Sequence, residues 1–213
     1  MGQGNQWRTQ YLDGNNAPTM LAVGVLDDSV LLFDDWYPEQ EDYEATGIEY
    51  LSILMTDVAH TYPYGIDPWY NYDRWDTFMS FLMYHLKGDE APRLLYSSVV
   101  DGKVIGDLIV VRNDGKGGKY QYHTEETGDE IFVQFLAPVT EVSAKAGITL
   151  FDVTEGKQVE GTYRSRGAGN KWYFEPTDEL VTGHTYELRV DSSIQGVKNG
   201  KSIGEGAVYE FVA

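Results

Sequence analysis

The sequence predicts an α/β segment over about the first 90 residues, followed by an all-β sandwich. In the first part, two continuous apolar runs, residues 19–25 and 48–55, are separated by a helical pattern and followed by another. Beyond Gly88 the chain changes to short alternating segments separated by turn dipeptides such as Asp101-Gly102. Apolar runs between helices are typical of buried parallel strands, and regular turns between alternating segments are typical of antiparallel sheets.

The elements of the first part follow in the order strand, helix, strand, loop, helix. Residues 38–45 form a short acidic helix that Gly47 stops, and Asp67-Pro68 predicts an N-cap with proline in the first turn of the second helix. Five apolar residues of that helix repeat at helical spacing and predict one buried stripe up to Lys87-Gly88: Trp75, Phe78, Met79, Leu82 and Leu86. This order is the closing section of a doubly wound sheet, in which two strands cannot bury both faces by themselves.

The second part reads as antiparallel strands. Apolar residues alternate on one face of each predicted strand: Ile131, Val133 and Phe135, then Trp172 and Phe174, then Tyr186, Leu188 and Val190, and finally Tyr209 and Phe211. Two such sheets face to face make a sandwich. Residues 92–128 predict a hairpin around Asp101-Gly102 that either adds a strand to the sandwich or links the two parts. The predicted division is therefore 1–91, 92–128 and 129–213.

Composition excludes several classes of function. The chain has 213 residues, with 16 Lys and Arg against 34 Asp and Glu and a formal charge of −18. That charge argues against nucleic acid and anionic membranes as partners. The absence of cysteine excludes a disulfide scaffold and a thiolate zinc site. No run approaches the roughly 20 apolar residues of a membrane span, and the first residues do not have the pattern of a signal peptide.

Asp27 and His60 are the candidate catalytic residues. Each follows an apolar strand, and their order suits the acid and base of a Ser, Asp, His triad. No Gly-x-Ser-x-Gly occurs, and Tyr163-Arg164-Ser165-Arg166-Gly167 lacks the first glycine. Asp28 competes with Asp27 for the acid position. The alternative interpretation makes the aspartate a turn residue and His60 an ordinary core or loop residue.

Three stretches of the first part together resemble the C-terminal end of α/β-hydrolases of the prolyl-oligopeptidase and esterase type. They are Gly24-x-x-Asp27-x-x-Val30, then Val58-Ala59-His60, then the helix from Trp75 to Gly88, and they cover about residues 17–96. The resemblance implies that Asp27 orients the imidazole and that His60 is base and then acid for a serine. It implies as partners the missing N-terminal hydrolase half and, for the parent protein, a small-molecule ester or peptide substrate. The isolated chain is expected to be inactive.

The second part resembles the bacterial Ig-like domain. The stretches that carry the resemblance are Ile131 to Val139 and the pattern Trp172-x-Phe174-x-Pro176-x-x-x-Leu180-x-x-Gly183-x-x-Tyr186-x-Leu188-x-Val190, over about residues 129–213. That resemblance implies a noncatalytic spacer or adhesive module and an extracellular or cell-surface location in a bacterium.

No cofactor and no metal are predicted. Asp101, Asp107 and Asp114, together with Glu125, Glu126, Asp129 and Glu130, offer oxygen ligands for calcium, but they lack the spacing of an EF-hand loop and favour solvated turns. The open strand edge of the α/β segment could drive homodimerisation. Two functions follow: the C-terminal portion of a serine hydrolase, or a noncatalytic surface or binding protein with an Ig-like module.

Overall fold

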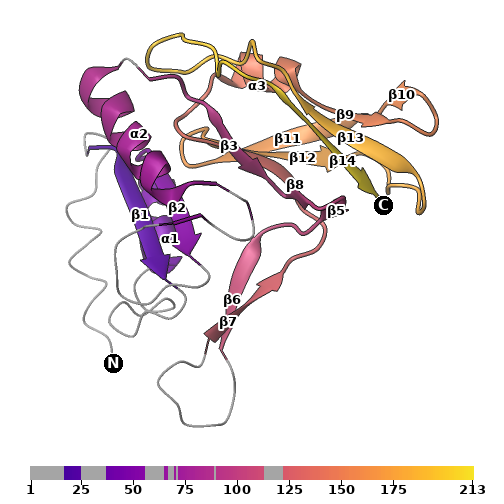
Figure 1. Ribbon diagram of the computed structural model, residues 1–213, viewed down its shortest axis with the longest axis horizontal. Helices are drawn as coiled ribbons and strands as arrows, with labels where there is room; N and C mark the ends of the chain where they lie inside the picture. Colours follow the sequence, from indigo (N-terminus) through magenta and orange to yellow (C-terminus); the bar gives the residue numbers. More distant parts are fainter. Residues whose placement is uncertain are drawn as a thin grey trace.

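The computed structural model describes residues 17–24, 37–55, 65–66, 70, 72–88, 90–112 and 122–213. Its first part, the α/β unit, contains two strands and two helices: β1 (Thr19–Gly24), α1 (Tyr37–Thr46), β2 (Tyr50–Met55) and α2 (Arg74–Lys87). Strand β1 pairs with β2 in parallel, with Thr19 opposite Tyr50 and Gly24 opposite Met55. The unit lies beside the larger β-rich part (Figure 1). None of the helices in these described ranges is long and apolar enough to cross a membrane.

Strand β2 is fully buried on one face and only half-buried at Ser52 and Leu54 on the other, although its continuous apolar run predicts burial of both faces. Leu51, Ile53 and Met55 point into a core that they share with α2 and with the residues that follow β8. The alternate residues, such as Tyr50 and Leu54, point to the opposite face, because side chains of a strand alternate. One face of β2 therefore packs in the core shared with α2, and the other face borders the sandwich.

Helix α2 begins later than the sequence predicts and buries a different face. Its N-cap is Asp73, whose side chain accepts a hydrogen bond from the Asp76 N–H at 2.8 Å, and not Asp67. The predicted end is correct, because Gly88 caps the helix in the left-handed conformation at φ 71°.

The residues that α2 buries are Arg74, Thr77, Phe81 and Tyr84. The predicted apolar stripe is rotated away from them, with Met79 exposed by 40% and Leu86 by 78%. The prediction of the buried stripe was wrong because α2 packs on a two-stranded sheet and on the second part of the chain. Phe81 and Tyr84 fill the space between those two partners.

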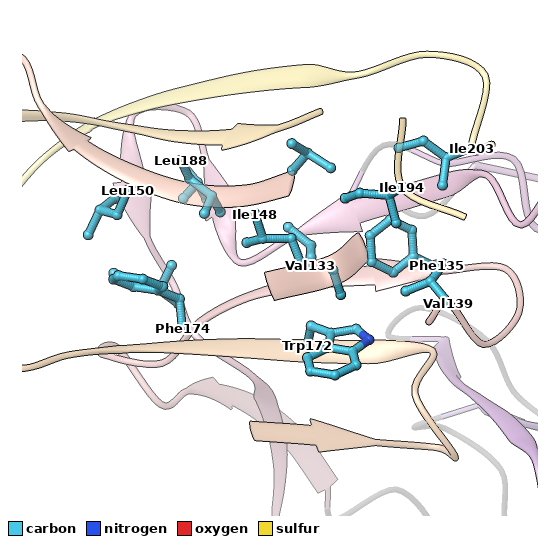
Figure 2. Close-up of a cluster of buried hydrophobic side chains, with 14 of the residues drawn as sticks. Val133, Phe135, Val139, Ile148, Leu150, Trp172, Phe174, Leu188, Ile194 and Ile203 are labelled. Carbon is cyan, nitrogen blue, oxygen red and sulfur yellow. The ribbon is translucent and has the colours of Figure 1, made fainter. Parts of the chain in front are cut away.

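The second part is a sandwich of two four-stranded sheets, in the orders β10-β9-β13-β14 and β11-β12-β8-β3. Its strands are β3 (Leu94–Ser97), β8 (Ile131–Phe135), β9 (Ile148–Asp152), β10 (Lys157–Gln158), β11 (Gly161–Arg166), β12 (Lys171–Pro176), β13 (Thr185–Val190) and β14 (Ala207–Val212), and the short helix α3 (Glu141–Gly147) precedes β9. Figure 2 shows Val133, Trp172 and Phe174 of one sheet facing Leu150 and Leu188 of the other. The apolar alternation predicted for these strands is therefore confirmed.

The described residues of 92–128 form two strand pairs and contribute one strand to the sandwich. Strands β4 (Val99–Val100) and β5 (Lys103–Val104) pair around Asp101 and Gly102, which both have positive φ, at 49° and 77°. Positive φ at both central positions is the mark of a type I′ turn. Strand β3 instead pairs with β8, and β6 (Leu108–Arg112) pairs with β7 (Tyr122–Glu126). The predicted hairpin around Asp101-Gly102 is therefore present but shorter than the apolar pattern indicates, and β3 adds a strand to the sandwich.

The two parts are joined by specific polar contacts as well as by the shared core. The Lys198 ammonium donates to the His85 carbonyl at 2.9 Å, and the Asn199 amide donates to the Gly88 carbonyl at 3.2 Å. These two side chains satisfy carbonyl groups at the end of α2 that have no partner inside the helix. At the other end of the junction, Asn170 Nδ2 donates to the Tyr50 carbonyl at 2.6 Å.

Candidate binding cleft

The catalytic residues proposed from the sequence, Asp27 and His60, lie outside the described residues, as does the competing Asp28. Of the residues considered for calcium, Asp107 is engaged by Lys171 in an ion pair. The described ranges contain no group of three or more His, Cys, Asp or Glu side chains arranged to hold a metal ion. The strongest candidate site is therefore elsewhere, at the junction of the two parts.

A cleft of about 160 Å³ lies between β2 and the outer face of the sheet β11-β12-β8-β3. We call it the tyrosine cleft, because five tyrosines are among its lining residues: Tyr50, Tyr70, Tyr72, Tyr96 and Tyr173. Polar residues from α1, from the segment before β6, from β8 and from the end of β11 to the start of β12 complete the lining, among them Gln40, Asp107, Gln134, Arg166, Asn170 and Lys171. Neither part of the chain forms this cleft without the other.

The register of β8 and β12 explains how the floor of the cleft is built. Lys171 lies opposite Gln134 and Tyr173 lies opposite Phe132, and all four side chains point away from the sandwich core. The intervening Trp172 and Val133 point into that core. The sequence carries a signal for this arrangement, because all five residues of β8 are buried, as a run apolar on both faces indicates. The apolar alternation of Ile131, Val133 and Phe135 indicates only the inner face of β8.

Three tyrosines form a stacked layer on one side of the cleft. The rings of Tyr70 and Tyr96 are 4.2 Å apart at an interplanar angle of 20°, and those of Tyr72 and Tyr96 are 5.2 Å apart at 17°. Phe132 meets Tyr96 edge-on at 6.2 Å. Such contacts hold the rings in fixed orientations, so the layer is a rigid aromatic surface.

Lys171, Asp107 and Tyr173 form a polar cluster at the floor. The Lys171 ammonium pairs with Asp107 Oδ1 and lies 3.8 Å from the centre of the Phe132 ring, while the Tyr173 hydroxyl donates to Asp107 Oδ2 at 2.8 Å. Burial lowers the pKa of Lys171 from its ordinary value, although Asp107 acts in the opposite direction. Burial and the neighbouring Asp107 raise the pKa of Tyr173. The cluster holds the segment before β6 against β12.

A tight turn between β11 and β12 closes one end of the cleft. Gly167 has a φ of 61°, and a Cβ at this position would come within 2.0 Å of Asn170 Oδ1. Its N–H donates to Glu44 Oε1 at 2.7 Å, and the same oxygen accepts from the Tyr50 hydroxyl at 2.8 Å. Burial and this hydrogen bond from Tyr50 to Glu44 raise the pKa of Tyr50. The glycine thus permits a direct contact between α1 and the sandwich.

Two lining residues have polar groups that are not satisfied within the described part of the chain. Arg166 has no carboxylate within ion-pair distance there. Gln40 Nε2 is buried and has no hydrogen-bond partner there either. Because buried polar groups are nearly always paired in folded proteins, the buried Gln40 donor points to a missing acceptor. Arg166 is exposed and lies 5.8 Å from the centre of the Tyr173 ring. The cleft therefore presents aromatic side chains, a cation and amide donors, which are groups that bind ligands.

A His–Asp pair that the sequence analysis missed lies outside the cleft. His184 Nδ1 and Asp152 Oδ2 are 2.9 Å apart, and Asp152 Oδ1 accepts from the Glu155 N–H at 2.9 Å. Burial acts to raise the pKa of Asp152, but the hydrogen bonds from His184 and the turn outweigh it and lower the pKa. The pair braces the turn between β9 and β10. Nothing in the spacing of residues 152 and 184 indicates this contact.

The Asp152 pair predicts a loss of stability in acid. A carboxylate whose pKa is lower in the folded state than in the unfolded state stabilises the fold above the unfolded value, near pH 4. That contribution disappears as the pH falls through the folded-state pKa. We expect Asp152→Asn to lower the Tm at pH 7 and to flatten its fall below about pH 4, measured by circular dichroism. The exposed Asp129→Asn is the control, and equal pH profiles for the wild type and Asp152→Asn would contradict the prediction.

Comparison with known proteins identifies one region. A family model described as the bacterial Ig-like domain matches residues 121–212, which include β7 to β14. No curated protein matches the chain. This match supports a bacterial Ig-like domain over residues 121–212, which is consistent with a surface or extracellular location. The hydrolase resemblance of the first part has no counterpart in these comparisons.

Solved structures show only distant similarity. The N-terminal part of the bacterial S-layer protein SbsC is 21% identical over 39% of this chain and 20% of its own, with a TM-score of 0.33. The native conformation of E. coli alpha-2-macroglobulin is 14% identical over 55% of this chain and 6% of its own, also at 0.33. The chain thus spans a fifth or less of the length of these proteins, and TM-scores this low do not establish a common overall fold.

Proposed function

We propose that this chain is a noncatalytic surface or binding protein of a bacterium and that it holds its ligand in the tyrosine cleft. The observation that carries the proposal is that both parts of the chain build this cleft. Among the described residues, its lining holds Arg166 without a carboxylate partner and a buried Gln40 amide without a hydrogen-bond partner. The bacterial Ig-like domain supports the surface or extracellular location. In this proposal the α/β unit lines one side of the binding site, and the Ig-like domain lines the other side.

The proposal predicts that binding depends on Tyr96, the middle ring of the stacked layer. With purified bacterial cell walls as the probe, the full chain should co-sediment with the insoluble material. Tyr96→Ala should weaken this binding about 30-fold, the effect of losing an aromatic residue that contributes about 2 kcal/mol.

Tyr96→Phe is the matched control, because it keeps the ring and should bind within about threefold of the wild type. Circular dichroism of each variant separates loss of binding from loss of fold. Equal co-sedimentation of folded Tyr96→Ala and wild type, or no co-sedimentation of the wild type, would contradict the proposed function.

A second candidate function is the C-terminal portion of a serine hydrolase, with Asp27 and His60 as acid and base. The parallel pairing of β1 and β2 with helices after each strand favours it, as do the exposed apolar residues Met79 and Leu86 of α2. The gene sequence upstream discriminates between the candidates, because both predict that this chain by itself does not react with a fluorophosphonate probe or p-nitrophenyl esters. This chain should not react, because it has no Gly-x-Ser-x-Gly. Stoichiometric labelling of a serine would contradict the noncatalytic proposal, and an in-frame Gly-x-Ser-x-Gly upstream in the gene would favour the hydrolase.

A further inference from the structure

We propose that a groove at one end of the Ig-like domain binds a segment of another protein in which an apolar side chain is flanked by lysine or arginine. This groove and the tyrosine cleft share no lining residue, so the inference goes beyond the proposed function. It is carried by the volume of the groove, by its apolar floor and by the carboxylates around it.

The groove opens between the two sheets of the sandwich. We call it the end groove, and it is lined by β5, the start of β8, the segment that ends β12 and follows it, and the end of β14: residues 103–104, 128–129, 131, 176–180 and 211–213. Figure 1 shows the C-terminus beside β5 at this end of the sandwich. The volume is about 730 Å³, and ligand pockets hold roughly 300–1,000 Å³. The end groove therefore has room for a short peptide segment.

The floor of the end groove is apolar and continuous with the core of the sandwich. Ile131 and Phe211 are 3% and 1% exposed and belong to that core. Val104 and Leu180 are half-buried and pack against it, and the neighbouring Val212 is 57% exposed. Covering such a surface with another apolar side chain releases water from both and is favourable. An aliphatic or aromatic side chain of the partner is therefore the anchor.

The charged residues of the lining select a cation. They are Lys103, Asp129, Asp178 and Glu179, so one cation and three carboxylates leave a charge of −2. All four side chains are exposed. None of the three carboxylates forms an ion pair with any residue that the structure describes. A cleft lined by one sign of charge attracts ligands of the opposite sign, more strongly where apolar walls exclude water.

The carboxylates next to the end groove are paired, in contrast to those that line it. Glu130 follows Asp129 in the chain, and Glu175 precedes Pro176. Both pair with Arg164 on the outer face of the sheet, at 2.9 and 3.0 Å. The negative charge of the end groove is therefore not simply a property of this end of the domain, because carboxylates one residue away have their own cation.

The surroundings of the end groove decide how a partner is held. A second copy of this chain is disfavoured, because it brings a formal charge of −18 to a negative groove. Strand addition is blocked at this end of β14, since the Val212 N–H already donates to the Gly102 carbonyl at 3.3 Å. Main-chain hydrogen bonds to a free strand edge are thus not available here. The partner is recognised through its side chains, one apolar and its neighbours basic.

Calorimetric titration of the full chain with a blocked peptide, one leucine with two lysines on each side, tests the proposal. Two comparison peptides replace the leucine by glycine or the lysines by glutamates. The leucine–lysine peptide should bind about tenfold more tightly than the glycine peptide, because only the leucine reaches the apolar floor. The glutamate peptide should not bind, because its charge has the same sign as that of the groove.

Glu179→Lys should weaken binding of the leucine–lysine peptide about tenfold, because it replaces an attractive charge in the lining by a repulsive one. Glu205→Lys is the matched control, since it changes the net charge of the chain by the same amount. Glu205 is exposed and precedes β14, at the opposite end of that strand from Val212. This variant should bind within about twofold of the wild type. Both positions are exposed, so an unchanged Tm should show that each variant is folded.

The outcomes separate a built site from general attraction of a basic peptide to an acidic chain. Equal affinities for the leucine and glycine peptides, or equal weakening by the two variants, would indicate general attraction and overturn the inference. No binding of the leucine–lysine peptide, or binding of the glutamate peptide, would also overturn it. Folded Tyr96→Ala should bind the peptide as the wild type does, so this inference and the cell-wall binding proposed for the tyrosine cleft can fail independently.

Discussion

Replacing Leu136 by alanine should lower the free energy of unfolding by about 2–5 kcal/mol, the cost of removing a fully buried leucine side chain. Leu136 follows β8 and is 0% exposed in the core between the Ig-like domain and the α/β unit, with Leu51 and Phe81 as neighbours. Its N–H donates to the Arg93 carbonyl at 2.9 Å, so its position is fixed. The substitution leaves a cavity at the junction of the two parts.

Leu86→Ala is the matched control, because it makes the same chemical change on the exposed face of α2. We expect it to change the free energy of unfolding by no more than about 0.5 kcal/mol. Urea unfolding followed by circular dichroism measures both variants. Equal losses, or a loss at Leu136 below about 1 kcal/mol, would show that this core contributes little, and the tyrosine cleft would then lack a fixed second wall.

Separating the chain near Asp89 should have the second large effect. Residues 89–213 contain all strands of the sandwich, including β3, and should fold. They should also bind a dye that reports exposed apolar surface, because removing the first part uncovers Leu136, Ala137 and Leu95. Residues 1–88 lose the same partners, so Leu51, Ile53 and Phe81 become exposed and the fragment should aggregate.

Size exclusion with light scattering on the full chain and both fragments measures these outcomes. The mass of the full chain also tests whether the open strand edge of the α/β unit drives homodimerisation. A monomeric fragment 1–88 that melts cooperatively would contradict the prediction and would show that the α/β unit is stable without the Ig-like domain. If fragment 89–213 does not bind the dye, the apolar residues on its outer face are not exposed, which would also contradict the prediction.

Local pattern was enough for most secondary structure. The two apolar runs predicted β1 and β2 within two residues, Gly88 marked the end of α2, and Asp101-Gly102 marked a type I′ turn. The inner residues of β8, β12 and β13 were identified by alternation. Each of these features depends on residues within a few positions of one another in the sequence. Such residues are close in space whatever the tertiary fold.

The buried side of α2 could not be predicted in the same way. Two stripes on this helix are apolar enough to be buried, and they differ by about one residue, or 100° of rotation. Contact with Leu136 and Ala137, about 50 positions further along the chain, determines that Phe81 and Tyr84 face inward. Asp27 and His60 lie outside the described residues, so their catalytic role stays a prediction from sequence spacing.

The sequence by itself determined that this protein has an α/β unit followed by an Ig-like sandwich, because hydrophobic period and turn chemistry are local properties. Only the tertiary structure decided where a ligand can bind. Tyr50, Tyr96 and Lys171 meet at one cleft although they come from β2, β3 and β12, and no spacing in the chain relates them. Their proximity arises because the α/β unit packs its apolar face on the outer surface of the sandwich, and that packing is determined by the shapes of two folded surfaces.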